Sequence, residues 1–101
     1  MEPGITDHPE QARFEIREDG ELAGFVVYRR NGDEITLLHT ETARGFRGRG
    51  VAGRLVNGVL DLAAKEGLAV IPRCPFVRDW IDDHPGYADL VPDDRRAEFG
   101  L

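Results

Sequence analysis

The sequence has almost no cysteine: Cys74 is the only one among 101 residues. A single thiol cannot form a disulfide within the chain, whereas small secreted domains usually depend on several disulfides. The cysteine content therefore favours a reducing compartment, and we expect a cytoplasmic protein.

Long apolar runs are also missing. No stretch approaches the roughly 20 apolar residues that span a bilayer, and the first ten residues are polar and acidic, unlike a signal peptide. We expect no membrane partner. A chain of 101 residues has enough apolar side chains for one core. We therefore expect one domain over residues 1–101, with a flexible tail at 1–11 and a frayed end at 93–101.

Positive charge is scarce overall, with 13 Lys and Arg against 19 Asp and Glu and a net charge of -6. This balance argues against a nucleic-acid partner, because such binding needs many cations to neutralise phosphates. Arg44, Arg47 and Arg49 nevertheless lie within six residues and form one basic turn that could hold a small anion. Cys74 and the three histidines lack a ligand spacing, so we expect no metal site.

The first half of the chain predicts an antiparallel meander. Three β-rich segments cover residues 13–17, 22–30 and 34–42, and the turn dipeptides Asp19-Gly20 and Asn31-Gly32 separate them. Three strands joined by two tight turns form a three-stranded meander.

The second half predicts a strand, helix, strand unit. Apolar residues recur every three or four positions from Val51 until Gly67, a natural helix end. The apolar run 68–71 is typical of a parallel strand that is covered on both faces. A C-terminal helix follows from Pro75 until His84, which precedes a proline. The expected fold class is α/β (α+β), with a mixed sheet whose fourth strand is parallel.

The turn Arg44–Ala52, between the third strand and the long helix, is the main candidate for a binding site. Its glycines let the backbone approach a ligand closely, and the following helix begins with free N–H groups and a positive dipole end. No Ser, Thr, Asp or Asn stands at the N-cap, so an anion could take that place. The alternative is that the glycines only form a tight turn. Neither a dinucleotide-binding motif nor a P-loop fits, because the acidic ribose ligand and the Gly-Lys-Ser/Thr sequence are missing.

Arg47-Gly48-Arg49-Gly50-Val51-Ala52 resembles the Q/R-x-x-G-x-G/A signature with which GNAT acetyltransferases bind the CoA pyrophosphate. The order of strand, loop, helix and strand is also similar, and the resemblance covers roughly residues 13–90. Short members of the superfamily provide the best match. They carry His-Thr-Glu before the loop and Cys-Pro-Phe after the last strand, as this chain does at residues 39–41 and 74–76.

The resemblance implies acetyl-CoA as the ligand and an amine, small or protein-borne, as the acceptor. The pantetheine arm would lie in a wedge between Glu41–Ala43 and Val70–Arg73. Backbone groups from Arg47 to Ala52 would bind the pyrophosphate, and Arg44 and Arg49 would add charge. The implied CoA-binding residues are Glu41, Thr42, Ala43, Arg44, Arg47, Gly48, Arg49, Gly50, Val51 and Ala52.

Cys74 and His39 are the candidate catalytic residues. Cys74 precedes Pro75 at the expected helix N-cap beside Arg73, a setting that favours a thiolate. The resemblance implies that this thiol acts near the thioester, and the alternative is an inert core cysteine. His39, predicted on one strand face with Ile35, Leu37 and Glu41, is either a base aimed at the acceptor or a structural histidine.

Many members of the superfamily carry a tyrosine as general acid on the helix after the last strand. Ile81 stands at the matching position here, and Tyr87 cannot be placed from the sequence. Trp80 is expected in the core because of its helical spacing.

Three functions remain open. The chain could be an N-acetyltransferase, acting by direct attack or through an acetylated Cys74. It could instead bind acyl-CoA or a protein without turnover, or it could be a scaffold whose glycine turn binds nothing.

Overall fold

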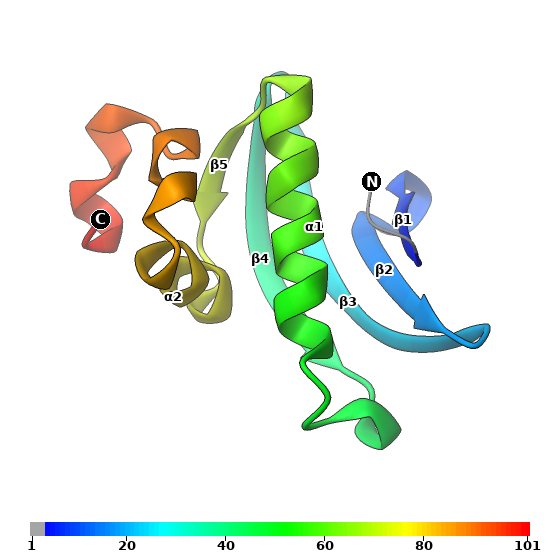
Figure 1. Cartoon of the computed structure of the whole chain (residues 1–101). Coiled ribbons are helices and arrows are strands. Elements are labelled where there is room, and N and C mark those ends of the chain that lie inside the picture. Colours follow the sequence, from blue (N-terminus) through cyan, green and yellow to red (C-terminus); the bar gives the residue numbers. More distant parts are fainter. Residues whose placement is uncertain (1–3) are drawn as a thin grey trace.

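The computed structural model describes residues 4–101, and the first three residues of the predicted tail lie outside this range. One mixed sheet has the strand order β1-β2-β3-β4-β5, with antiparallel pairs from β1 to β4 and a parallel pair β4-β5. Helix α1 crosses one face of the sheet, and α2 lies beside it near β5 (Figure 1). The strands are β1 (Ile5–His8), β2 (Arg13–Glu18), β3 (Glu21–Asn31), β4 (Glu34–Thr42) and β5 (Ala69–Pro72); the α-helices are α1 (Val51–Glu66) and α2 (Pro75–Asp83); the 3-10 helices are η1 (Pro9–Gln11), η2 (Arg44–Phe46), η3 (Pro85–Leu90), η4 (Asp93–Arg95) and η5 (Ala97–Phe99).

The predicted meander is confirmed as β2, β3 and β4. Asp19, Gly20 and Gly32 all have positive φ angles, of 52°, 80° and 62°, which the tight turns between these strands require. The strand, helix, strand unit is also confirmed, since β5 pairs in parallel with the first half of β4. No helix within residues 4–101 is long and apolar enough to cross a bilayer.

The N-terminal segment differs from the prediction of a tail over residues 1–11. Residues 5–8 form β1, which pairs with β2 in the register Ile5 to Ile16. Ile5 is only 5% exposed, and the Tyr28 hydroxyl donates a hydrogen bond of 2.6 Å to Asp7. The burial of Ile5 and the hydrogen bond from Tyr28 thus hold this short strand against the sheet, although its polar composition predicted a tail.

The C-terminal segment also differs from the predicted frayed end at 93–101. It contains η4 and η5 and folds back against α2, where Arg78 donates to the carbonyl oxygens of Phe99 and Gly100 at 2.8 and 3.2 Å. Arg73 lies over the Phe99 ring, 5.4 Å from its centroid. The guanidinium of Arg78 and the packing of Phe99 and Leu101 against the core together hold this segment in place.

The core lies between the sheet and the two helices. Leu55, Val59 and Leu60 of α1 and Val77 and Ile81 of α2 are all fully buried in it. Both helices therefore cover the same face of the sheet, and their N-termini lie at the end of the molecule where β4 and β5 finish (Figure 1).

Candidate functional site

Strands β4 and β5 pair over only part of their length. Their register ends with Leu37 opposite Pro72, whereas β4 continues to Thr42 and pairs there only with β3. The register with β3 shifts at the same point, so Leu38 is an extra residue in β4. Such a bulge bends and twists a strand. The bulge thus coincides with an opening between β4 and β5.

The position of this opening corrects the predicted wedge. Val70 and Ile71 lie inside the paired region, opposite Ile35 and Thr36, so they do not border the opening. On the β4 side the predicted wall, residues 41–43, lies beyond the last pair with β5, as expected.

The glycine turn leads from the end of β4 into α1. Gly48 and Gly50 have φ angles of 80° and 73°, so both positions require a left-handed backbone that glycine adopts without strain. Gly50 is the N-cap of α1, and no side chain caps the helix. The first amide of α1 with an acceptor inside the helix is that of Arg54, which donates to Gly50 at 3.1 Å. The preceding amides, Val51 to Gly53, are therefore available to an anion.

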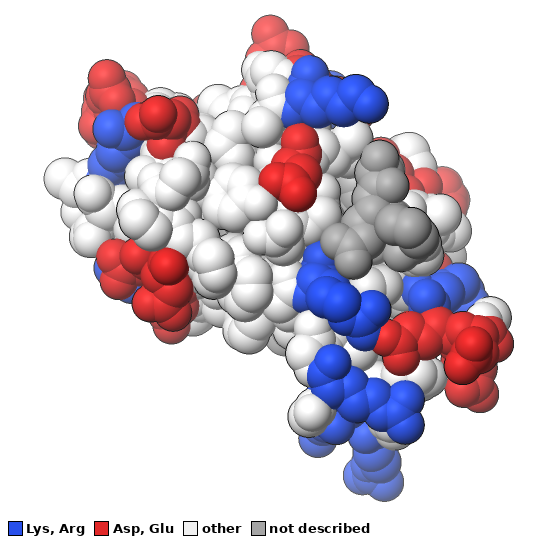
Figure 2. Space-filling model, viewed as in Figure 1, with Lys and Arg blue, Asp and Glu red and all other residues white. Residues whose placement is uncertain are grey.

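The arginines around this turn fall into two groups. Arg49 lies 3.8 Å from the Glu18 carboxylate, and Arg54 donates a hydrogen bond to the same carboxylate. Arg44 and Arg47 are exposed and have no ion pair within residues 4–101. In Figure 2 a positive patch covers the loop before α1, and negative side chains lie next to it. The turn thus keeps two cations that no carboxylate of the described chain neutralises.

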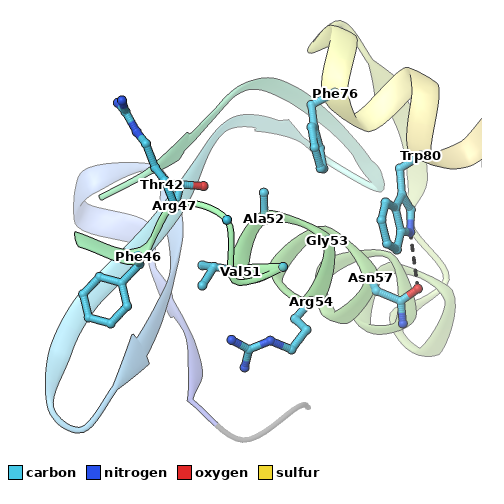
Figure 3. A pocket seen from close by; sticks show the side chains of 12 residues that line it. Thr42, Phe46, Arg47, Val51, Ala52, Gly53, Arg54, Asn57, Phe76 and Trp80 are labelled. Carbon is cyan, nitrogen blue, oxygen red and sulfur yellow. Dashed lines mark hydrogen bonds between the residues drawn. The ribbon is translucent and has the colours of Figure 1, made fainter. Parts of the chain in front are cut away.

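A cavity of about 510 Å³ opens beside the turn, between the first halves of α1 and α2. At one end it is bordered by Arg47, Gly48 and Gly50, and at the other by Asn57 and two aromatic side chains (Figure 3). Its lining residues are Thr42, Phe46, Arg47, Gly48, Gly50, Val51, Ala52, Gly53, Arg54, Asn57, Phe76 and Trp80.

The aromatic end of the cavity belongs to α2. Phe76 and Trp80 are one helical turn apart, their rings are 6.2 Å apart and nearly parallel, and Phe76 is 41% exposed. The Trp80 ring packs on α1 at Gly53, where a Cβ would stand only 2.8 Å from it. Trp80 packs against the core, as the sequence predicted, and it also forms a wall of the cavity.

Cys74 lies at the base of the opening as the N-cap of α2. Its N–H donates to the Leu37 carbonyl at 2.8 Å, and its Sγ lies 3.3 Å from the Thr40 hydroxyl oxygen. The residue is only 3% exposed, and its thiol does not line the cavity. Its place confirms the predicted N-cap.

His39 lies on the face of the sheet opposite to the helices. The bulge at Leu38 reverses the alternation, so that His39 pairs with Val27 whereas Leu37 pairs with Tyr28 on the other face. The prediction that His39 shares a face with Ile35 and Leu37 is therefore wrong. It does share a face with Glu41, and its Nε2 lies 2.6 Å from the Glu41 carboxylate, in solvent.

Tyr87 is held away from the thiol. Its hydroxyl donates to Asp61 at 2.6 Å and lies 2.9 Å from the side chain of Asn57, both on α1. Burial and the hydrogen bond to Asp61 raise the pKa of Tyr87 to about 12. Ile81, at the position where many relatives carry a tyrosine, is fully buried. Neither residue can donate a proton near Cys74 in this arrangement.

Several contacts of the site were not predicted from the sequence. Asn57, Phe76 and Trp80 meet only because α1 and α2 pack side by side, and Glu18 reaches Arg49 from a distant hairpin. The spacing of Phe76, Trp80 and His84 at four residues could have indicated an aromatic face on α2. Within residues 4–101 no three His, Cys, Asp or Glu side chains are grouped as a metal site would need.

Comparison with known proteins agrees with this geometry. The family model for GCN5-related N-acetyltransferases matches residues 13–90. Protein NATD1 of Mus musculus is 30% identical over 86 residues, covering 82% of this chain and 78% of its own length. Protein NATD1 of Xenopus tropicalis is 31% identical over 91 residues, covering 84% of each.

Solved structures share the fold. A GCN5-like protein from Staphylococcus aureus superposes with a TM-score of 0.66 at 23% identity, over 87% of this chain and 86% of its own. The ribosomal-protein-alanine N-acetyltransferase of Brucella melitensis biovar Abortus 2308 has a TM-score of 0.56 at 22% identity, over 79% of this chain and 60% of its own. The match of the family model over most of the chain, together with the NATD1 relatives, shows that the chain belongs to the GCN5-related N-acetyltransferase family.

Proposed function

We propose that this chain is an acetyl-CoA-binding N-acetyltransferase that works as one cytoplasmic domain and transfers an acetyl group to an amine. One observation carries the proposal. The uncapped first turn of α1 lies beside two arginines without an ion pair in residues 4–101 and beside the cavity. All of them lie near the end of β4, beyond its last pair with β5. Anions bind at such helix N-termini because free amides and the helix dipole act together.

The glycine turn suits a diphosphate. At Gly48 and Gly50 a Cβ would meet no atom within 4 Å, so this space is open to a ligand. We assign the pyrophosphate to the amides from Arg47 to Ala52 and the nearest charges to Arg44 and Arg47. This assignment favours Arg44 and Arg47 over Arg49, because Glu18 already pairs with Arg49.

The opening between β4 and β5 suits an extended chain with amide groups. Beyond Leu37 the edge of β4 has lost its partner strand, so backbone groups of Thr42 can bind the pantetheine arm as an added strand would. The backbone groups of Ala43, which the sequence also predicted for this role, already bond to Ala23 and Phe46. Thr42 also lines the cavity beside the glycine turn. A path from the turn to Cys74 would therefore pass Thr42.

Bound acetyl-CoA supplies an activated acetyl thioester, and the chain supplies the groups around it. In one route the Cys74 sulfur attacks the acetyl carbon, the bond from that carbon to the CoA sulfur breaks, and the thiol proton passes to the departing sulfur. An amine then attacks the acetyl carbon, the bond from that carbon to the Cys74 sulfur breaks, and the proton that the amine loses returns to this sulfur. In the other route the amine attacks directly and Cys74 gives its proton to the CoA sulfur.

The acceptor would approach from the far face of the sheet. His39 and Glu41 lie there, bonded to each other and exposed. We propose that His39 accepts the proton of the attacking amine and that Glu41 holds the imidazole. His39→Gln should lower the rate of transfer without changing CoA affinity, and an equal loss of CoA affinity would exclude this role.

Acetyl-CoA labelled in the acetyl group tests the chemistry. Incubation with the wild type, Cys74→Ala and Cys74→Ser should show CoA release in the wild type that both variants lose. Label on the intact wild-type protein after acid quench would select the acetyl-cysteine route, and release without label would select direct transfer. Release that persists in Cys74→Ala would exclude a catalytic thiol.

A non-catalytic acyl-CoA-binding module is the second candidate. It is favoured by the burial of Cys74, which is 3% exposed, and by the lack of a tyrosine near the thiol. Tight CoA binding without CoA release, across a panel of small amines and basic peptides, would support this module over the enzyme.

Gly50 provides the test of the binding site itself. In Gly50→Asp a carboxylate stands at the N-cap, where the pyrophosphate would bind, and we expect CoA affinity to fall about a hundredfold. Gly50→Asn is the matched control, because it has the same size and the same strained positive φ but no charge. Equal affinities of the two variants would contradict the assignment.

A further inference from the structure

The sequence His39-Thr40-Glu41 contains one side chain, that of Thr40, to which the proposed function gives no role. The imidazole and the carboxylate lie on the face of the sheet opposite to the helices, where they bond to each other. Thr40 pairs with Val26, a core residue on the face that the helices cover, so its side chain lies on that face. The bulge at Leu38 causes this division, because strict alternation would put His39, rather than Thr40, on the helix side.

Thr40 contacts the candidate catalytic thiol directly. Its hydroxyl oxygen lies 3.3 Å from the Cys74 sulfur, and neither group has another hydrogen-bond partner in the part of the chain that the structure describes. The two residues are 34 positions apart in the sequence. They meet because the Cys74 N–H bonds to the Leu37 carbonyl at 2.8 Å, which joins the start of α2 to β4 just before the bulge. Backbone contacts therefore hold the hydroxyl and the sulfur together.

The surroundings of the Cys74 sulfur make this hydroxyl important. Cys74 is the N-cap of α2, but its side chain accepts no hydrogen bond from the first amides of that helix, and Pro75 has no N–H. The neighbouring cation, Arg73, pairs with Glu98 at 3.0 Å. Cys74 is also only 3% exposed, so little water can reach a charge on its sulfur. A buried anion is costly unless a donor bonds to it, and the Thr40 hydroxyl is placed to be that donor.

We propose that Thr40 is a further catalytic residue, whose hydroxyl donates a hydrogen bond to the Cys74 sulfur while that sulfur is an anion. The inference rests on the proposed acetyl transfer and holds for both of its routes. In direct transfer the Cys74 proton passes to the CoA sulfur, and Thr40 bonds to the sulfur anion left behind. In the other route the bond from the acetyl carbon to the Cys74 sulfur breaks when the amine attacks, and Thr40 bonds to the departing sulfur. Thr40 keeps its own proton throughout, and the sulfur regains one from the amine or from solvent.

Thr40→Val tests the hydroxyl, because valine keeps the branched shape that suits a strand and loses only the donor. We expect the kcat of CoA release to fall about thirtyfold, as the loss of a hydrogen bond to a charged group implies. KM and the CoA dissociation constant should stay within about twofold, because the bond forms only during the reaction. Thr40→Ser keeps the hydroxyl and should restore kcat to within about threefold of the wild type.

A second measurement does not need turnover. Cys74 is the only cysteine of the chain, so the rate of its alkylation by iodoacetamide at one fixed pH, followed by mass spectrometry, reports on this sulfur alone. Iodoacetamide is small and uncharged, and it reacts with the sulfur anion. We expect alkylation about tenfold slower in Thr40→Val than in the wild type, and close to the wild-type rate in Thr40→Ser. Thr36→Val is the matched control for both measurements, since it makes the same change on β4 where this strand still pairs with β5.

The two measurements separate this inference from the proposed function. An unchanged kcat in Thr40→Val, or a loss that Thr40→Ser does not restore, would overturn the role of Thr40 and leave the acetyl transfer intact. Equal alkylation rates in the wild type and Thr40→Val would also overturn it. A wild type that releases no CoA would defeat the proposed transfer. In that case slower alkylation of Thr40→Val alone would still support the bond from Thr40 to the sulfur anion.

Discussion

Two clusters of arginines, one on β2 and one on the loop before α1, differ in how their charge is balanced. On β2, Arg13 and Arg17 both bond to Glu15, at 2.9 and 3.1 Å, and His8 lies 3.2 Å from the same carboxylate. The Glu15 side chain is only 3% exposed. This cluster is closed, because every oxygen of its carboxylate has cationic partners.

The cluster on the loop is open. Glu18 pairs with Arg49 and Arg54 there, but Arg44 and Arg47 extend into solvent without a carboxylate from residues 4–101. A closed cluster contributes to the stability of the fold, whereas an open one beside free amides keeps its charge for a ligand. The same residue type thus serves stability in one region and binding in the other.

The largest effect should come from breaking the closed cluster. Glu15→Gln removes the central charge and leaves two guanidiniums near a buried amide, and we expect the free energy of unfolding to fall by about 2 kcal/mol, the partial exposure of both arginines included. Urea unfolding at pH 7 measures this loss. CoA affinity should not change, and a weaker CoA complex would mean that the two clusters are coupled.

The stability difference between the wild type and Glu15→Gln should also depend on pH. Burial acts to raise the pKa of Glu15, but the hydrogen bonds from Arg13 and Arg17 and the charge of His8 outweigh it and leave the pKa below its ordinary value of 4.5. The stability from Glu15 is therefore present above about pH 4.5 and is lost as the pH falls through the lowered pKa. The difference between wild type and Glu15→Gln should shrink on acidification, and a constant difference would contradict this account.

Removal of one charge from the open cluster should have a smaller effect, and this effect should be on CoA affinity. Arg47→Gln should weaken CoA binding about fivefold at low ionic strength, and less at high salt, because an exposed charge is screened. Arg29→Gln is the control, since Arg29 is also exposed but lies on β3 away from the turn. Equal titration curves for the two variants would show that Arg47 does not face the ligand.

The smallest expected change is an increase in CoA affinity. Glu18→Gln releases Arg49 and Arg54, so we expect CoA to bind about threefold more tightly; an exposed ion pair worth below about 1 kcal/mol cannot give much more. Glu21→Gln, on the same hairpin, changes the net charge equally without an ion pair within the described residues. A gain in both variants would indicate net charge, and no gain in Glu18→Gln would show that Glu18 does not compete with the ligand.

The sequence predicted those structural elements that are determined by residues close together along the chain. The hairpin dipeptides, the apolar stripe from Val51 and the glycine at position 67 each act within a few residues, and all appear in the structure at those places. The glycine turn was predicted for the same reason, since its neighbours along the chain are also its neighbours in space.

Features that depend on distant residues were missed. The bulge at Leu38 shifts the register against β3 and turns His39 to the other face, which strict alternation cannot reveal. Strand β1 exists because Ile5 and Asp7 find partners on β2 and β3. The aromatic end of the cavity needs two helices to pack side by side, so the second role of Trp80, as a cavity wall, could not be predicted.

The central claim is that the open cluster and the uncapped start of α1 bind the CoA diphosphate. Calorimetric titration of CoA into the folded wild-type protein, at low and at physiological salt, tests it most directly. We expect one molecule of CoA to bind per chain, with an affinity that falls as salt rises. A protein that is folded by circular dichroism and gives no binding heat with CoA or acetyl-CoA at either salt, and no competition in a fluorescence titration, would contradict the claim.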